Sequence, residues 1–219
     1  MHILLLDQRL ADRPCPELES LVAAFAGGDA RVSVCGPAVG EPRAGLLATH
    51  QGWPIRLDQL PLSHPHPEWS VFFESMTSAS CSISAAAASL PEQLQGLLRE
   101  AVRRAVTQAV DATDVDVLFV CQAGLLVEFA IETGPPVAAH ADSCDLASLH
   151  SAGRLRDIVA AALGSCDLLA AETSETADQL GAAWVEPDLE RPIEVWPLAA
   201  GAGQIIQGCQ TALARRFAR

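Results

Sequence analysis

Short runs of apolar residues alternate along the chain with segments in which apolar residues recur every three or four positions. Uninterrupted apolar runs are typical of strands buried on both faces, and the wider spacing is typical of amphipathic helices. Runs of the first kind predict seven strands, at His2–Leu6, Arg31–Cys35, Pro54–Leu57, Val115–Val120, Val137–Ala139, Leu168–Ala171 and Ile193–Trp196. The alternation predicts an α/β fold: a Rossmann-like, doubly wound, mainly parallel sheet with helices on both faces.

Helical spacing predicts at least six helices between these strands, the clearest of them about Glu92–Val110. Ser89-Leu90-Pro91-Glu92 matches a capping box that would begin this helix. The other helices are predicted at Glu17–Phe25, from Trp69 to Met76, Leu125–Glu132, Leu155–Leu163, Glu175–Leu180 with Ser174 as its cap, and Gln204–Phe217.

Three segments lack either pattern and predict irregular structure. Gly36–Gly52 is rich in Gly and Pro and predicts a loop, and Leu62–Glu68 contains two prolines. Ser78–Ser89 consists largely of Ser and Ala, so we expect it to be mobile or weakly helical. At 219 residues, the chain predicts one Rossmann-like domain over residues 1–219, in which 198–219 form a terminal helix and the start of a linker to a C-terminal domain.

The chain is strongly acidic, with 27 Asp and Glu against 14 basic residues and a net charge of −13. Such a surface repels nucleic-acid phosphates and anionic membranes, so we expect neither as a partner. Every basic residue is Arg; without Lys, the chain cannot form a Schiff base or a Walker A phosphate loop. Seven scattered Cys and an N-terminal strand in place of a signal peptide predict reduced thiols and a cytoplasmic location.

An ordered series of motifs between Asp114 and Leu198 is the most informative part of the sequence. It comprises the runs DVDVLFV, AGLL, GPPVAAHADSCDL, LGSCDLLAAETSET and IEVWPL. The series resembles the N-terminal, acceptor-side domain of family 4 (GT4-type) retaining glycosyltransferases of the GT-B fold. In that family the corresponding motifs read DVVH.H, P.V...HG.D, AD.VIA.S and I.VIPNGVD at matching intervals.

The resemblance implies that His140 is the catalytic histidine at the junction of sugar donor and acceptor. We expect it in a loop just after a strand, at the sheet edge where open α/β folds bind ligands. A loop histidine bonded to a neighbouring carboxylate is the alternative. The remaining expected acceptor- or donor-binding residues are Gln8, Arg9, Gln122, Asp142, Asp145 and Ser174.

Two departures from the family pattern limit what the chain is expected to do alone. The turn after the first strand, Asp7–Asp12, lacks the glycines that let a backbone approach donor phosphates. The family's second domain, which binds the nucleotide sugar and carries paired glutamates, has no counterpart after Trp196. We therefore expect the chain to bind a sugar or small-molecule acceptor, to meet a nucleotide-sugar donor only together with a second domain, and not to transfer sugar by itself.

Other constellations lead to no further site. His64-Pro65-His66 and the cluster of His140, Cys144 and His150 do not have the spacing of a metal motif, so we expect no metal and no cofactor. Trp69, Phe72, Phe73 and Met76 form an apolar face for which core packing is favoured over an acceptor groove. The sequence leaves two questions open: whether the chain forms a homo-oligomer, and whether it is instead a non-catalytic α/β module that binds a small ligand or a protein partner.

Overall fold

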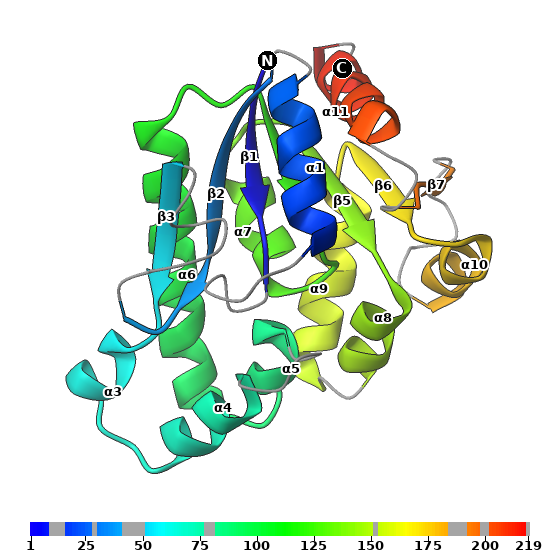
Figure 1. Ribbon diagram of the computed structural model, residues 1–219. Coiled ribbons are helices and arrows are strands. Elements are labelled where there is room, and N and C mark those ends of the chain that lie inside the picture. The colour runs from blue at the N-terminus through cyan, green and yellow to red at the C-terminus, as the bar shows by residue number, and fades with distance from the viewer. Residues whose placement is uncertain are drawn as a thin grey trace.

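The structure, a computed structural model, describes residues 1–8, 16–27, 30–40, 51–76, 82–150, 153–183, 192–197 and 202–217. Seven strands form one sheet in the order β3-β2-β1-β4-β5-β6-β7, and every neighbouring pair is parallel (Figure 1). The strands are β1 (His2–Leu6), β2 (Arg31–Ala38), β3 (Gln51–Arg56), β4 (Val117–Val120), β5 (Val137–Ala141), β6 (Leu168–Ala171) and β7 (Glu194–Val195). The predicted doubly wound α/β fold is therefore confirmed.

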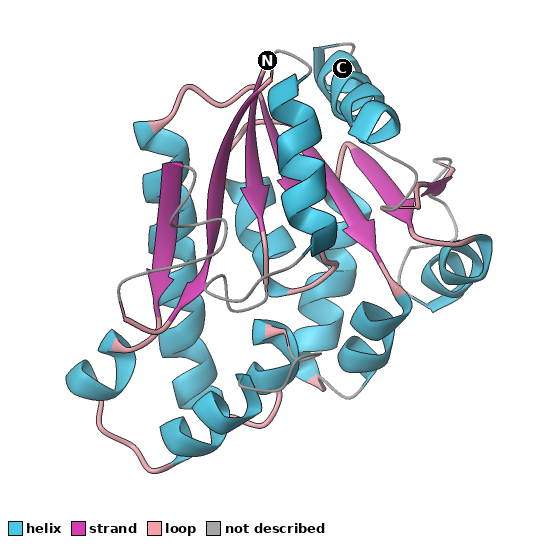
Figure 2. Cartoon of the chain, viewed as in Figure 1, coloured by secondary structure: helices cyan, strands magenta, loops and turns pink. Residues whose placement is uncertain are grey.

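Helices cover both faces of this sheet, with a further group at the carboxyl ends of the strands (Figures 1 and 2). One face carries α1 (Pro16–Gly27) and α11 (Ala202–Phe217), and the other carries α6 (Glu92–Ala112), α7 (Leu125–Glu132) and α9 (Arg154–Ser165). The remaining helices are α3 (Gln59–Ser63), α4 (Glu68–Met76), α5 (Ile83–Ala87), α8 (Ser143–His150) and α10 (Ser174–Ala183).

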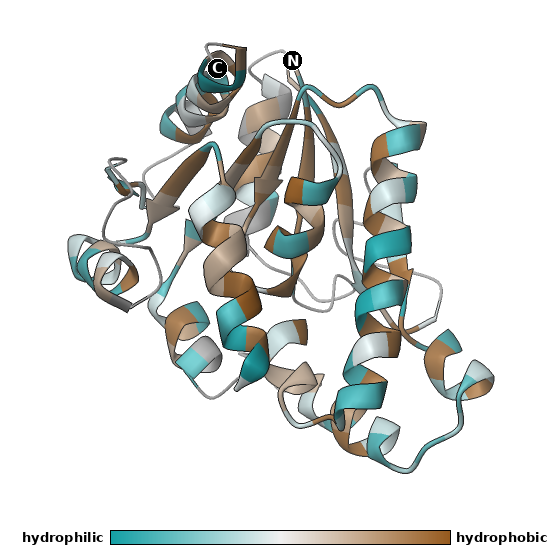
Figure 3. Cartoon of the chain, turned by 180° about the vertical axis from the view of Figure 1, so that it is seen from behind, coloured by the Kyte–Doolittle hydropathy of each residue, from teal (hydrophilic) through white to brown (hydrophobic). Residues whose placement is uncertain are grey.

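Each face of the sheet has its own hydrophobic core, because alternate residues of a strand point to opposite faces. Ile3 and Leu5 pack toward Phe25 of α1 and Ile205 of α11. Leu4 and Leu6 belong to the larger core under α6, α7 and α9, together with the buried stripe of α6: Leu94, Leu98, Val102, Val106 and Ala109. Figure 3 shows hydrophilic and hydrophobic residues alternating along α6, as expected for a helix with one face in solvent.

Trp69, Phe72 and Met76 of α4 are buried in the larger core, so this apolar face packs inside the protein as favoured. Ser82 caps the short helix α5 by accepting a hydrogen bond from the amide of Ala85 at 3.3 Å. Residues Ile83, Ala86 and Ala87 of α5 are also buried. The Ser/Ala run, expected to be mobile or weakly helical, forms this short helix, whose small side chains let it pack closely; residues 77–81 lie outside the described residues.

The loop predicted at Gly36–Gly52 begins later than expected, since β2 continues to Ala38 and β3 begins at Gln51. Pro37 is tolerated inside β2 because the pairing of β2 with β1 ends at Cys35. The N–H that proline lacks therefore removes no hydrogen bond between β2 and β1. Residues 41–50 lie outside the described residues.

The capping box predicted for α6 was also wrong, although the helix itself is present. Pro91 occupies the cap position without a side-chain bond, and the hydroxyl of Ser89 donates instead to the carbonyl of Ala86 at 2.8 Å. A proline at this position already sets the backbone angle that leads into the helix.

Five of the seven Cys lie in the described part of the chain, and all five are free thiols. Four of them are buried and Cys144 is exposed. Burial raises the pKa of Cys35 and of Cys209 to about 12, which keeps both thiols protonated at neutral pH. Cys15 and Cys81 lie outside the described residues. In the described segments, no helix is both long enough and apolar enough to cross a lipid bilayer.

Candidate functional site

The candidate site lies at the carboxyl edge of the sheet, beginning where β1 and β4 are neighbours. Crossovers from these two strands lead to opposite halves of the sheet, which makes this the topological switch point. Open α/β folds bind ligands in the crevice outside the strand ends at such a point. In Figure 1, α5 and α8 lie below these strand ends.

Gln8 and Gln122, which follow β1 and β4, form a buried pair at the switch point. The amide of Gln8 donates to Oε1 of Gln122 at 2.9 Å, and Nε2 of Gln8 donates to the Gln122 carbonyl at 2.5 Å. Both side chains are at most 5% exposed. Both residues were expected to contact a ligand, and the structure brings them together, but each hydrogen-bonds the other instead of facing solvent.

The N-terminus of α7, where free backbone amides could bind an anion, is occupied by side chains of the chain itself. Oγ of Ser84 in α5 accepts a hydrogen bond from the amide of Leu125 at 2.8 Å and donates to Oε1 of Gln8. A side chain at Gly124 would overlap both Gln8 and Ser84. Ser84 and Gly124 were not singled out by sequence analysis, because 40 positions separate them and only the fold brings them together.

Asp142 and Asp145 cap α8, a helix that the sequence analysis missed. The amide of Asp145 donates to Oδ1 of Asp142 at 2.8 Å, and the amide of Asp142 donates to Oδ2 of Asp145 at 3.0 Å. This reciprocal pair is a capping box, and the Asp-Ser-Cys-Asp run is the signal that could have predicted it. Oδ2 of Asp145 also accepts from the amide of Ala123 at 3.2 Å, so a buried carboxylate lies beside the start of α7.

His140 lies inside β5 and is fully buried, whereas a loop position was expected. The strand continues to Ala141 because it pairs with β6 as far as Ala171. Nε2 of His140 lies 2.9 Å from the Trp196 carbonyl and 3.3 Å from Oε2 of Glu172. The alternative interpretation was a loop histidine bonded to a neighbouring carboxylate. Glu172 is such a carboxylate, but His140 lies in a strand and not in a loop.

The electrostatics of His140 favour a neutral ring. Burial lowers the pKa of His140, while the Trp196 carbonyl and then Glu172 act in the opposite direction. Nδ1 is buried without a hydrogen bond in the described part of the chain, so the single proton of a neutral ring belongs on Nε2, where the Trp196 carbonyl accepts it. The side chain of Glu172 is 31% exposed, so it is the carboxylate through which this cluster reaches solvent.

The other predicted contact residues do not join this cluster. Arg9 lies outside the described residues. Ser174 is the first residue of α10 and is exposed, and the cap of that helix is Thr173, whose Oγ1 accepts from the amide of Thr176 at 3.1 Å. The predicted cap at Ser174 was therefore one residue late. The catalytic role of His140 and the ligand contacts of Gln8, Gln122, Asp142, Asp145 and Ser174 stay predictions.

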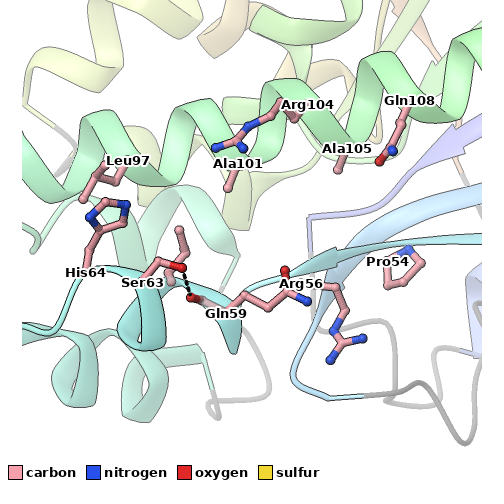
Figure 4. A pocket seen from close by; sticks show the side chains of 11 residues that line it. Pro54, Arg56, Gln59, Ser63, His64, Leu97, Ala101, Arg104, Ala105 and Gln108 are labelled. Carbon is pink, nitrogen blue, oxygen red and sulfur yellow. Dashed lines mark hydrogen bonds between the residues drawn. The ribbon is translucent and has the colours of Figure 1, made fainter.

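No three His, Cys, Asp or Glu side chains of the described segments gather in a way that could hold a metal ion. A pocket does open at the other end of the sheet, between β3, α3 and α6, well separated in strand order from β5 and β6 (Figure 4). No protein-family model and no curated protein sequence matches this chain.

Proposed function

We propose that the chain is the acceptor-side domain of a retaining glycosyltransferase with a GT-B fold. The observation that carries this proposal is that, among the described residues, the β4–α7 side of the switch point is closed by the chain's own side chains. Ser84, Asp145 and Gln122 accept hydrogen bonds from backbone amides, those of Leu125, Ala123 and Gln8, that would otherwise be free to meet an anion. A domain of this fold that leaves the nucleotide to another domain is expected to have such an edge.

The surface beside the closed switch point suits a neutral ligand rich in hydroxyl groups. Asp142 and Glu172 follow adjacent strands, and both are partly exposed. Carboxylate oxygens accept hydrogen bonds from sugar hydroxyls, whereas they repel phosphate. The motif order between Asp114 and Leu198 supports the same assignment, because its strands are the neighbours β4, β5, β6 and β7.

His140 then acts through Glu172, since a fully buried ring does not reach a ligand in this conformation. Its Nε2 holds the carboxylate of Glu172 at the surface, and Glu172 accepts a hydrogen bond from an acceptor hydroxyl. In this arrangement His140 is a positioning residue. Direct contact with a ligand would require that the ends of β5, β6 and β7 separate.

The test is an assay of the complete protein that the gene encodes, supplied with UDP-glucose or GDP-mannose and a panel of sugar acceptors. We expect transfer, or slow release of UDP or GDP, from the complete protein and none from residues 1–219 alone. Glu172→Gln should lower kcat/KM about tenfold or more, because it removes a charged acceptor of a hydrogen bond. Asp178→Asn, an exposed change on α10, is the matched control and should leave the rate unchanged.

The proposal fails if the complete protein binds neither nucleotide sugar, or if its coding sequence contains no second Rossmann-like domain. In that case the alternative is a stand-alone module that binds a small ligand. The pocket between β3 and α6 is the observation that favours it.

A further inference from the structure

The pocket beside the edge of the sheet is independent of the carboxyl-edge cluster. It measures about 270 Å³ and is lined by β3, by the segment from Gln59 to His64, and by one face of α6. Figure 4 shows α6 on one side, with its labelled residues spread along the helix, and Pro54, Gln59 and Ser63 on the other. β3 is at one end of the strand order, whereas His140 lies in β5.

Part of the inner surface of the pocket is apolar and includes small side chains. Ala101 and Ala105 are four residues apart on α6 and therefore lie on one face of the helix. The ring of Pro54 and the side chains of Leu60 and Leu97 complete the apolar lining. Because two alanines face the opening, a compact apolar group can approach the helix closely.

The polar groups around this lining can donate hydrogen bonds, and none of the lining residues that the structure describes is Asp or Glu. Arg104, Gln59, Gln108 and His64 provide a guanidinium, two amides and an imidazole. In a chain with 27 acidic and 14 basic residues, a pocket whose described lining holds two arginines and no acid is unusual in its charge. Its chemistry therefore favours a ligand that brings a negative group.

Arg104 is the cation best placed to meet that group. Its side chain is 74% exposed, and its ion pair in the described segments joins Nε to Oε1 of Glu100 at 3.4 Å. Oε2 of Glu100 is bound more closely by Arg103, at 3.0 Å. Arg56, by contrast, is held by Asp58 through two bonds of 3.0 and 2.9 Å. Figure 4 shows the guanidinium of Arg104 extending from α6 toward the end of the pocket where Leu97 and His64 lie.

We propose that this pocket binds a small monoanion: a carboxylate attached to a compact apolar body about the size of a benzene ring. The carboxylate pairs with the planar guanidinium of Arg104, which matches its two oxygens. The amides of Gln59 and Gln108 offer further hydrogen bonds, and the apolar body packs on Ala101, Ala105 and Pro54. This inference does not rest on the glycosyltransferase proposal, because no residue is shared between the two sites.

The test uses benzoate as the probe and benzamide as its neutral counterpart of the same shape. Binding is followed by NMR through the methyl groups of Ala101 and Ala105 and the indole N–H of Trp69. That indole donates to the carbonyl of His64 at 2.8 Å and therefore reports on the wall of the pocket. We expect saturable shifts with benzoate and a Kd for benzamide at least about fivefold higher, since an exposed ion pair contributes modestly.

Three variants test the site and separate it from general charge effects. Arg104→Gln should raise the Kd for benzoate at least about fivefold and leave benzamide unaffected. Arg154→Gln is the matched control, because Arg154 is 75% exposed and its replacement removes the same charge outside the pocket. This change should leave the affinities for benzoate and for benzamide unchanged. Ala105→Leu, which fills the pocket, should abolish the shifts.

The inference is overturned if benzoate causes no saturable shift at these methyls at millimolar concentrations. It is equally overturned if benzoate and benzamide bind alike, or if Arg154→Gln weakens benzoate as much as Arg104→Gln does. Circular dichroism of each variant confirms that the comparison is made between folded proteins.

Discussion

Two buried histidines give the stability of this protein a defined dependence on pH. Burial lowers the pKa of both His2 and His140 in the folded state. The unfolded chain, with its histidines near the ordinary pKa of about 6.5, binds more protons. Stability from these residues is therefore complete above about pH 6.5 and is lost as the pH falls toward the folded pKa.

We expect the free energy of unfolding to fall between pH 7.5 and 5.5, by at most about 1.4 kcal/mol per pH unit for each histidine. His140→Gln should reduce this slope, whatever its effect on absolute stability. His66→Gln, an exposed change, should preserve it. Urea unfolding at several pH values provides the measurement, and an unchanged slope for His140→Gln would show that the ring is not neutral in the fold.

Gly208 in α11 is required by packing and not by ligand binding. A Cβ at this position would overlap the indole ring of Trp196, which is 2% exposed and cannot move aside. Gly208→Ala should therefore destabilise the protein by about 1–3 kcal/mol, although alanine favours helix. Gly203→Ala in the same helix meets no atom within 4 Å and should be neutral or slightly stabilising. Equal effects of the two changes in thermal unfolding would contradict this packing.

Among the elements, α5 has an importance that its length does not suggest. It is five residues long, yet Ser84 joins it to the ends of both β1 and β4 by bonding Gln8 and the amide of Leu125. Its Ile83 is fully buried, and the Ile83 amide donates to the carbonyl of Gln8 at 2.9 Å. The helix thus closes the switch point with both backbone and side-chain bonds.

Ser84→Ala should cost about 1–3 kcal/mol, because it removes the hydrogen-bond partner of the buried Leu125 amide and of the buried Oε1 of Gln8. Ser75→Ala in α4 is the matched control, since that exposed hydroxyl bonds only to the carbonyl of Val71 on its own helix; we expect a change below about 0.5 kcal/mol. Denaturant unfolding of both variants decides the matter: a Ser84 variant as stable as the Ser75 variant would mean that α5 does not close this edge.

The element pattern was predictable from the sequence to a large extent, for a physical reason. β1, β6 and α7 begin and end at the predicted residues because continuous apolar runs and helical stripes are local signals. Helix α8 was missed although its Asp-Ser-Cys-Asp capping box is equally local. The expected functional roles of Asp142 and Asp145 hid their capping role.

The site at the scale of the whole molecule was less predictable, because its contacts join distant segments. Ser84 and Leu125 meet only when α5 folds under the sheet, and Glu172 reaches His140 only through the pairing of β5 with β6. The burial of His140 likewise depends on Trp196, 56 residues further along the chain. A single sequence predicts the strand order only weakly, and it does not predict these contacts.

The central claim is that the β4–α7 side of the switch point, in the described part of the chain, is closed to nucleotides by the chain's own side chains. Its most direct test is an NMR titration of this chain with UDP and with ADP, observed at the backbone amides of Ala123, Gly124 and Leu125. We predict no saturable change at these amides up to millimolar nucleotide, since Asp145 and Ser84 already accept two of the three N–H bonds. Saturable shifts at Gly124 and Leu125 with either nucleotide would contradict the account.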